Sequence, residues 1–473
     1  MARSSSQTGP FSPWPLTPSV PRCFRDHPIT AALIVLSIGS SAAGLLTSGR
    51  WLSPRFSDQV SLLFFLRQSR LIQSFSVDSA TSPPDVWLRR LGPGAGAQRW
   101  QSSDGHRWWM VWLQDGAPLL ILQRTTASKP SRLASSFPDV ELVFADELHR
   151  TSFFSTRPSG GLTRSKLEKD CIDRLTRSTA VAWNPSGLSA IAGPLTFALH
   201  SGSHGCLSLA LDGRRMLLLE GSVSSRPLSS APWSLRRPPG IESAFRTFRG
   251  ASPTNHRLAL HWQGASTKPL FASLLQRRLI SDAIEKTYGL TPKFQAEWLK
   301  APMDLQAKLS NDGPFKASLQ LSLAFDPRHD EIVNKGLASL ASNLEQRGLR
   351  PEVNQSTVGT NKAQSAAIIW KGSDQNVLGH WSVQSTTPDQ MSLQLSLGRP
   401  LEAVLPSLTL KPKSGLSVRF DAKQLRRLGW LKATWPALVQ QAGQGELLLK
   451  PMLGHRSGQA ETWYWLKGQL SLR

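Results

Sequence analysis

Short runs of alternating apolar and polar residues, separated by turn signals, occupy much of the chain after residue 97. Asp-Gly dipeptides stand between such runs at four places: Asp104, Asp115, Asp212 and Asp312. Because Asp-Gly suits the two positive-φ positions of a type I′ turn, each dipeptide predicts a β-hairpin. The expected hairpins pair 98–102 with 106–114, 106–114 with 118–123, 206–211 with 215–220, and 304–309 with 315–325. The pattern therefore predicts an antiparallel sheet.

Amphipathic helical patterns interrupt these strands. Apolar residues recur at helical spacing in five segments: 59–75, 162–177, 269–288, 328–347 and 422–441. Such spacing is typical of a helix with one buried face. The first of these helices either lies on lipid head groups or packs into the domain that follows. A closing strand is expected at 462–472, and the whole pattern predicts an α+β fold of antiparallel meanders alternating with amphipathic helices.

The tetrapeptide Gln-Leu-Ser-Leu occurs three times in the second half of the chain. Its copies begin at Gln320, Gln394 and Gln469, with successive separations of 74 and 75 residues. Each copy lies on an alternating strand that follows one of the last three predicted helices. The equal spacing and shared context favour a repeated helix-plus-meander unit.

An uncharged stretch at 27–49 has the length and composition of a membrane span. Its apolar core, 29–46, roughly matches the hydrocarbon thickness of a bilayer at about 1.5 Å per residue. A cleaved signal peptide is the alternative, because Ser41, Ala42 and Ala43 supply small residues at a cleavage position. We favour a single-pass anchor because the uncharged stretch continues to Gly49. Arginines flank both sides, so the orientation stays open, with an extracytoplasmic large domain as the simplest expectation.

The chain is longer than one compact core usually supports, so we expect several units. The predicted units are a disordered Pro/Ser-rich leader (1–26), the transmembrane anchor (27–49), a first α+β domain (50–221), a Pro/Ser/Arg-rich linker (222–253) and a second α+β domain with the repeated units (254–473). The linker is assigned from its composition and its lack of sustained periodicity.

The charge is strongly basic and spread along the chain. Lys and Arg number 55 against 32 Asp and Glu, a net charge of +23. Such a diffuse positive field favours the lipid bilayer over nucleic acid as a partner. Arg226, Arg236 and Arg237 form the densest basic group and are interpreted as part of a solvated linker. Trp108 and Trp112 share one face of a strand and are interpreted as core residues rather than a stacking platform.

Candidate chemistry is sparse. His200, His204 and Cys206 are three metal-ligating residue types within a short span, but the intervening residues indicate a turn between strands. Three cysteines are too few for a disulfide scaffold. Cys171 and Cys206 would pair in an oxidising compartment, but buried free thiols are the more common state and are favoured here.

The most acidic block comprises Asp139, Glu141, Asp146, Glu147 and His149. Its carboxylates and histidine would serve acid-base catalysis if they converged in a cleft. Alternation around Val140 instead favours an ordinary strand followed by an acidic helix start. Phosphate-binding loops and nucleophile-elbow motifs are absent from the sequence, so no catalytic, cofactor-binding or metal-binding residue is assigned.

The anchor at 29–46 and the closing sequence at 425–472, which includes Trp435-Pro436-Ala437 and the terminal run 466–470, resemble a family of uncharacterised cyanobacterial proteins with one N-terminal membrane segment. The resemblance implies a membrane-attached protein in a photosynthetic bacterium and carries over no active-site residue.

We therefore expect a membrane-tethered, non-enzymatic binding or scaffold protein, with a protein or a lipid as its ligand. The alternative is a membrane-anchored hydrolase or metal-dependent enzyme with dispersed site residues. The ligand and the oligomeric state stay open.

Overall fold

The computed structural model describes residues 58–114, 118–124, 137, 139–155, 164–192, 202–212, 215–238, 258–275, 277–310, 316–354, 367–387, 390–398, 415–431, 441–453 and 463–472. The predicted leader, 1–26, and anchor, 27–49, lie outside these residues. Among the helices that are described, none combines the length and the apolar character needed to cross a membrane.

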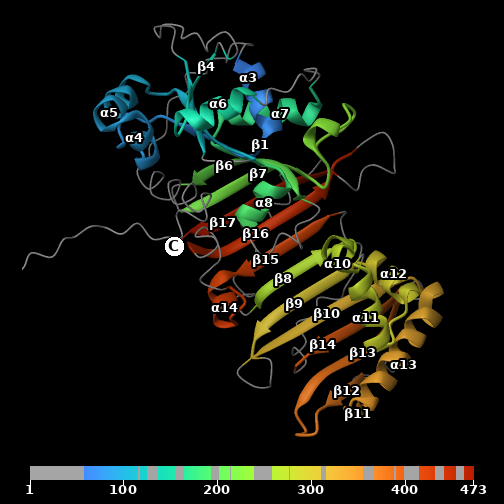
Figure 1. Ribbon diagram of the computed structural model, residues 1–473. Coiled ribbons are helices and arrows are strands. Elements are labelled where there is room, and N and C mark those ends of the chain that lie inside the picture. Colours follow the sequence, from blue (N-terminus) through green and yellow to red (C-terminus); the bar gives the residue numbers. More distant parts are fainter. Residues whose placement is uncertain are drawn as a thin grey trace, which may run out of the picture.

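One antiparallel sheet runs through all the described parts of the chain (Figure 1). It contains seventeen strands, and each neighbouring pair is antiparallel. From one edge to the other the order is β4 (Val140–Val143), β3 (Leu119–Gln123), β2 (Arg107–Leu113), β1 (Ser69–Ser76), β5 (Ala180–Trp183), β6 (His204–Asp212), β7 (Met216–Ser224), β17 (Trp463–Leu472), β16 (Ala442–Pro451), β15 (Leu416–Asp421), β8 (Leu258–Gly264), β9 (Met303–Leu309), β10 (Ala317–Phe325), β14 (Gln390–Leu397), β13 (Val377–Thr387), β12 (Ala367–Lys371) and β11 (Arg350–Asn354).

The last strands of the chain lie in the middle of this sheet. β17 pairs with β7, with Leu466 opposite Gly221, and β15 pairs with β8, with Leu416 opposite Gly264. Strands β15 to β17 thus join the strands of the first half to those of the second by unbroken backbone hydrogen bonding. The predicted domain boundaries, 50–221 and 254–473, stay a prediction about folding units.

In the described parts of the chain, the same succession of elements occurs four times: a strand, then one or more helices, then a β-hairpin. The helices in these four connections are α4 (Asp85–Leu91) with α5 (Pro93–Ser102), α8 (Pro185–Ala192), α10 (Lys268–Leu275) with α11 (Arg278–Tyr288) and α12 (Pro292–Lys300), and α14 (Ala422–Arg427). In each case the leading strand pairs with the first strand of its hairpin: β1 with β2, β5 with β6, β8 with β9 and β15 with β16. Each helical segment therefore connects two adjacent antiparallel strands.

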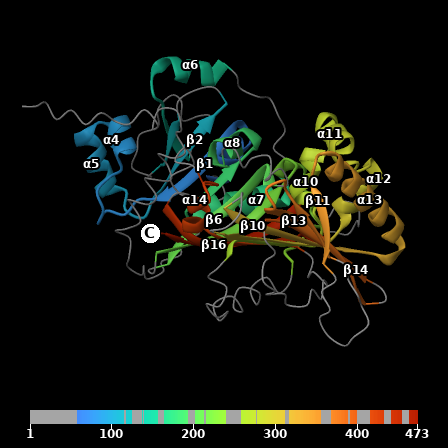
Figure 2. The ribbon, with the colours of Figure 1, turned by 90° about the horizontal axis from the view of Figure 1, so that it is seen from below.

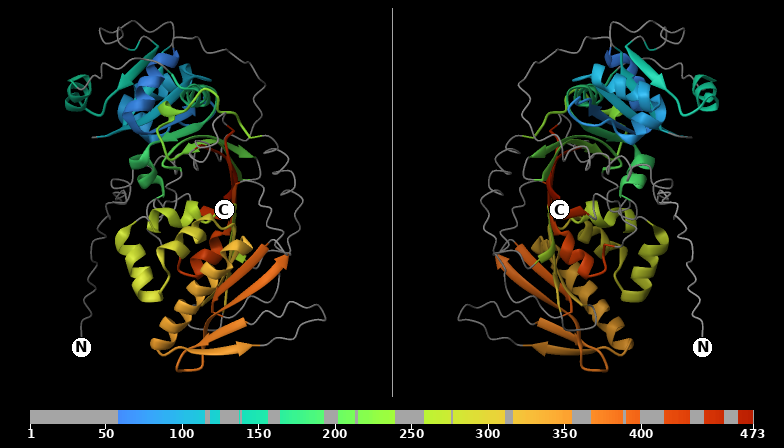
Figure 3. Two further views of the ribbon diagram at one scale, coloured as in Figure 1. Left: turned by 90° about the vertical axis from the view of Figure 1, so that its right-hand side faces the viewer. Right: turned by 90° about the vertical axis from the view of Figure 1, so that its left-hand side faces the viewer.

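The other α-helices are α3 (Asp58–Gln68), α6 (Glu147–Ser155), α7 (Lys166–Arg177) and α13 (Asp330–Gln346), as far as the described ranges go. Helices α10 to α13 lie together on one side of the sheet (Figures 2 and 3). We call this side the helix-covered face, and Leu71, Leu209 and Leu305 are on it. The opposite face carries the alternate residues, such as Ile72, Ser208 and Asp304, because successive side chains of a strand point to opposite sides.

Three apolar clusters lie on the helix-covered face. Trp87 of α4 and Trp100 of α5 pack against Trp108, Met110 and Trp112 of β2. A small cluster surrounds Ala422 of α14, and the third packs α12 and α13 against β10, β12, β13 and β14. The interpretation of Trp108 and Trp112 as core residues is confirmed, since their side chains are almost fully buried.

Among the described residues, the opposite face has one apolar cluster, which extends over β1 to β6 and includes Trp463 and Trp465 of β17. Helix α3 contributes Leu62, Leu63 and Phe65 to it, and α7 contributes Leu167, Ile172 and Leu175. The bidentate ion pair of Arg67 with Glu168, at 2.7 and 2.9 Å, joins these two helices. The first half of the sheet is thus covered on both faces.

Three of the four predicted hairpins are confirmed: β2 with β3, β6 with β7, and β9 with β10. The hairpin at Asp104 is wrong, because 98–102 belongs to helix α5, which begins at Pro93 and contains the helix formers Ala97, Gln98 and Arg99. The closing strand at 462–472 is confirmed as β17.

Three predicted helices have different bounds. The helix at 59–75 ends at Gln68, and its second half is strand β1. Ile72 and Ser74 of β1 lie between β2 and β5, so pairing on both edges overrides the local helical spacing. The helix at 269–288 is divided into α10 and α11. The helix at 422–441 ends at Arg427, and 432–440 lies outside the described residues.

Candidate functional site

The opposite face changes from apolar to polar beyond β17. Eight neighbouring strands place one polar residue each in direct register, and we call this line of residues the polar row: His380, Ser396, Gln320, Gln306, His261, Arg419, Glu446 and Gln469. Directly opposed side chains in an antiparallel sheet are close enough to interact. The row therefore forms a continuous polar line across eight strands.

The Gln-Leu-Ser-Leu copies are part of this pattern. Gln320 on β10 and Gln469 on β17 belong to the polar row, and Gln394 on β14 lies opposite Ser322 on the same face. The leucines of each copy point to the other face. The tetrapeptide thus matches a strand with one polar and one apolar face, while an internal repeat stays a prediction.

Asp304 is the most buried acid next to the polar row, with its side chain 5% exposed. It accepts hydrogen bonds from Gln263 at 2.7 Å and Gln306 at 3.0 Å, and it pairs with His261 at 3.1 Å. Burial opposes ionisation, but the hydrogen bonds and the charge of His261, with the two amides, hold the pKa of Asp304 below its ordinary value. This network ties β8 to β9.

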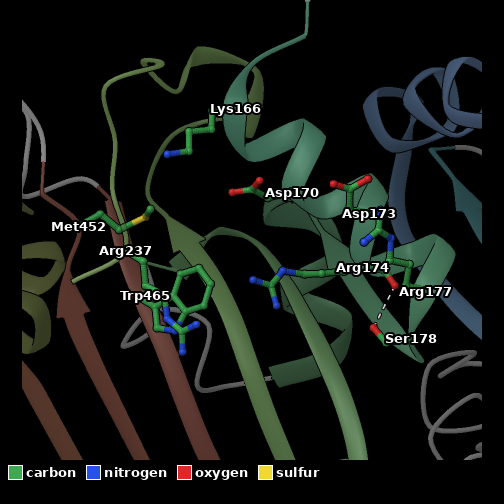
Figure 4. Close-up of a pocket in the computed structure, with 9 residues that line it drawn as sticks. All are labelled: Lys166, Asp170, Asp173, Arg174, Arg177, Ser178, Arg237, Met452 and Trp465. Carbon is green, nitrogen blue, oxygen red and sulfur yellow. Dashed lines mark hydrogen bonds between the residues drawn. The ribbon is translucent and has the colours of Figure 1, made fainter. Parts of the chain in front are cut away.

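A basic pocket lies where α7 meets the polar part of the opposite face (Figure 4). It is a cavity of about 430 Å³, a volume within the range of small-ligand sites. We define the basic pocket by its lining residues: Lys166, Asp170, Asp173, Arg174, Arg177, Ser178, Arg237, Met452 and Trp465. Helix α7 supplies one wall, and β17 and the segment that contains Arg237 supply the other.

The sequence of α7 explains its orientation. Ser165 and Glu168 form a capping box at its start. Leu167, Cys171 and Leu175 are buried under the helix. The polar residues of the pocket recur at 166, 170, 173, 174 and 177, which is the spacing of the other helix face. Local patterning alone therefore aims several charged side chains away from the core.

Two arginines converge on one indole ring in the pocket. The guanidinium carbon of Arg174 lies 4.9 Å from the centre of the Trp465 ring, and that of Arg237 lies 4.6 Å from it. These distances are typical of cation–π contacts. Figure 4 shows Arg174 reaching from α7 toward Trp465. The indole N–H of Trp465 is buried without a hydrogen-bond partner among the described residues.

Hydrogen bonds hold both arginines in place. Arg174 donates to Ser208 Oγ at 3.2 Å and to the carbonyl oxygen of Glu220 at 3.0 Å. Arg237 pairs with the carboxylate of Glu220. Lys166 donates to the carbonyl oxygen of Leu235. The cations are thus positioned before any ligand binds, which reduces the ordering that binding requires.

The electrostatics of the basic pocket favour an anion. Its lining residues include four cations and two carboxylates. Burial lowers the pKa of Arg174, against the opposing charges of Glu220 and Asp170, and burial raises the pKa of Asp170. A partly desolvated guanidinium gains more from an anionic partner than an exposed one does, because the local dielectric is lower. The arrangement can bind a carboxylate, sulfate or phosphate group.

Cys171 of α7 and Cys206 of β6 form a disulfide, with their Cα atoms 5.7 Å apart. The expectation of free thiols is therefore wrong. The two residues are 35 positions apart in sequence, and only the packing of α7 on β6 brings them to bonding distance.

The disulfide also removes one potential ligand from the three metal-ligating residue types near 200–206. Cys206 is not available as a thiolate, and His200 lies outside the described residues. His204 contacts Ser203 Oγ at 3.2 Å, and burial lowers its pKa. The part of the chain that the structure describes contains no group of metal-ligating side chains. The candidate set of His200, His204 and Cys206, which the sequence does not favour as a metal site, therefore lacks its cysteine.

The acidic block does not converge. Asp139 immediately precedes β4 and Glu141 belongs to that strand. Glu141 forms a bidentate ion pair with Arg99 at 2.9 and 2.6 Å. Asp146 pairs with His149 at 2.8 Å at the start of α6, and Glu147 of that helix pairs with Arg150. The interpretation as a strand followed by an acidic helix start is confirmed.

Arg237 is the site residue that sequence reasoning misplaced. The sequence predicts a solvated linker for its segment, but Leu228, Ala231 and Leu235 are buried in the cluster under α7. For Trp465 the sequence predicts only a place in the closing strand. The polar spacing along 166–177 was the one local signal for the pocket, since the other wall comes from distant parts of the chain.

Comparison of the sequence and the structure with protein-family models, curated proteins and solved structures finds no match.

Proposed function

We propose that the chain is a membrane-tethered, non-enzymatic binding protein whose ligand is an anion held in the basic pocket. The observation that carries this proposal is the convergence of Arg174 and Arg237 on Trp465. Two guanidinium groups held beside one indole ring offer several N–H donors to one group of oxygen atoms.

The lining residues support binding rather than catalysis. The described residues that line the basic pocket include no histidine or cysteine, and the hydroxyl among them, that of Ser178, donates to the carbonyl oxygen of Arg174 at 3.0 Å. A serine nucleophile needs a base within hydrogen-bond reach. The hydrolase or metal-enzyme alternative uses His200, His204 and Cys206, or the acidic block. Cys206 is in the disulfide, and the acidic side chains form separate ion pairs.

The tether and the compartment are parts of the proposal. The apolar stretch at 27–49 would anchor the chain. A disulfide is typical of proteins that face an oxidising compartment, so the pair Cys171–Cys206 supports an extracytoplasmic domain. The four strand–helix–hairpin connections support an origin by internal repetition. The cyanobacterial resemblance stays a prediction.

Calorimetric titration of the full chain in nonionic detergent with inorganic phosphate and with sulfate tests this function. We expect binding of at least one of them, weakened about tenfold or more in Arg174→Gln/Arg237→Gln, because charge-assisted hydrogen bonds contribute about 1.5–3 kcal/mol each. Arg237→Gln alone keeps the test valid if the double variant does not fold, since this side chain is 39% exposed.

The matched control is Arg278→Gln/Arg328→Gln, which removes the same charge from side chains that are 94% and 89% exposed in the second half of the chain. Its affinity should equal that of the wild type. Equal weakening in both double variants, or no binding by the wild type, would refute the anion site.

A further inference from the structure

We infer that the anion bound in the basic pocket is the phosphate of a lipid head group, and that Trp233 and Leu453 contact the membrane surface beside it. The inference rests on the proposed function and names the ligand of the same site.

Two large apolar side chains are exposed on the two segments that carry the pocket residues Arg237 and Met452. Trp233 is 64% exposed and Leu453 is 53% exposed. Leu453 follows the pocket residue Met452, and Trp233 lies four positions before Arg237. A tryptophan and a leucine beside cations are typical of a surface that enters the interfacial region of a membrane.

Backbone hydrogen bonds join the two segments that carry these side chains. Arg236 and Leu453 form a reciprocal pair, with N···O distances of 2.8 and 3.0 Å. Lys166 donates to the carbonyl oxygen of Leu235, which attaches the same segment to α7. The exposed apolar residues and the pocket cations therefore belong to one connected structure.

Phosphate matches the donors of the pocket. Guanidinium groups bind phosphate oxygens through paired N–H donors, and an ammonium adds a point charge. The exposed Arg226 and Arg236 lie on the same segment as Arg237 and extend the positive surface. With a net charge of +23, the chain would also be attracted to anionic lipids before a head group enters the pocket.

The proposed tether would keep the pocket near the bilayer. Residues 50–57 separate the apolar stretch from α3 and span about 28 Å at most when fully extended. Helix α3 is bound to α7 by the Arg67–Glu168 ion pair, and α7 forms the pocket wall. A site for free phosphate would not need to lie near the bilayer, whereas a site for a lipid head group must.

Hydrogen exchange of the full chain in lipid nanodiscs tests this inference. The discs contain either phosphatidylcholine alone or phosphatidylcholine with phosphatidic acid, and inorganic phosphate is added to the first kind in a separate arm. We expect phosphatidic acid to slow amide exchange at 226–238 and 445–453. Arg174→Gln/Arg237→Gln should abolish this protection, whereas Arg278→Gln/Arg328→Gln should retain it.

Trp233→Ser/Leu453→Ser separates the two sources of phosphate. This variant should lose the protection by phosphatidic acid but keep the protection by inorganic phosphate at 166–178. Protection by inorganic phosphate without any effect of phosphatidic acid would overturn the lipid inference and leave the proposed function intact. Undiminished lipid protection in Arg174→Gln/Arg237→Gln would overturn the inference in favour of diffuse attraction. Absence of protection in both arms would overturn the inference and the proposed function together.

Discussion

The disulfide of Cys171 and Cys206 attaches α7 to β6. It lies close to the hydrogen bond by which Arg174, a residue of the basic pocket, also joins α7 to β6. Arg174 follows Cys171 by one helical turn, Ser208 follows Cys206 by two residues, and Arg174 donates to Ser208 Oγ at 3.2 Å. A covalent bond and a hydrogen bond thus hold one wall of the basic pocket against the sheet. We therefore expect the position of Arg174 to depend on the oxidation state of the two cysteines.

Cys171→Ser/Cys206→Ser should lower the free energy of unfolding by about 3–4 kcal/mol, as expected for a closed loop of this length. It should also weaken anion binding, because α7 is then less firmly held. Denaturant unfolding without reductant measures the first effect, and titration with phosphate measures the second. Cys23→Ser is the control and should change neither. Modification of all three cysteines by a thiol reagent in denaturant without reductant would show that the bridge is absent.

Glu168→Gln should destabilise the fold by about 1–3 kcal/mol. Gln preserves the N3 position of the capping box but removes the charge that faces Arg67, and the Glu168 side chain is only 2% exposed. The expected loss of stability is smaller than for a fully buried pair because the Arg67 side chain is 29% exposed. Thermal unfolding measures the loss. Glu147→Gln, at a side chain that is 75% exposed, should stay within about 0.5 kcal/mol of the wild type. Equal stability of the two variants would contradict the structural role of the ion pair.

Gly336→Ala and Gly94→Ala should change stability in opposite directions. Alanine favours a helix over glycine by about 0.5–1 kcal/mol, and a Cβ at Gly94 in α5 would meet no atom within 4 Å. A Cβ at Gly336 in α13 would lie 2.5 Å from the Phe294 ring, which is 1% exposed and has no room to move. We expect a loss of about 1–3 kcal/mol there by overpacking. Melting temperatures of both variants check the prediction, and a gain from Gly336→Ala would show that α13 does not pack on α12 in this way.

Asp304→Asn should destabilise the protein near neutral pH by about 1–3 kcal/mol and much less in acid. The pKa of Asp304 is lower in the folded state than its ordinary value of 3.8, because His261, Gln263 and Gln306 together outweigh the effect of burial. Its contribution is therefore complete above the ordinary value and is lost as the pH falls through the lower folded pKa. Unfolding curves between pH 7 and pH 3 for Asp304→Asn, the wild type and the exposed control Asp282→Asn measure the difference. A stability gap independent of pH would contradict the ionised state of Asp304.

Local signals predicted the hairpins well. The alternating strands around Asp115, Asp212 and Asp312 pair as expected, because adjacent strands with a short turn need no information from the rest of the chain. The failures occurred where distant partners decided the structure. The segment at 69–76 has helical spacing, yet it becomes β1 because β2 and β5 pair with both of its edges.

The candidate site was far less predictable than the strands. The basic pocket combines Arg174 from a helix, Arg237 from an irregular segment and Trp465 from the last strand. No local sequence pattern predicts that these three segments are in contact. The cysteines illustrate the same difficulty. Their positions are given by the sequence, but their pairing depends on the packing of α7 over β6.

The sequence by itself determined the alternation of strands and helices, the amphipathic faces of α7 and β10, and the basic charge of the chain. These properties follow from residue type and spacing, which act over a few positions. Only the tertiary structure decided that β15 to β17 lie between β7 and β8, that the polar row crosses eight strands, and that α7, Arg237 and Trp465 enclose one pocket. Such contacts depend on the relative free energies of many alternative long-range strand pairings. A local sequence pattern does not show which of these pairings has the lowest free energy.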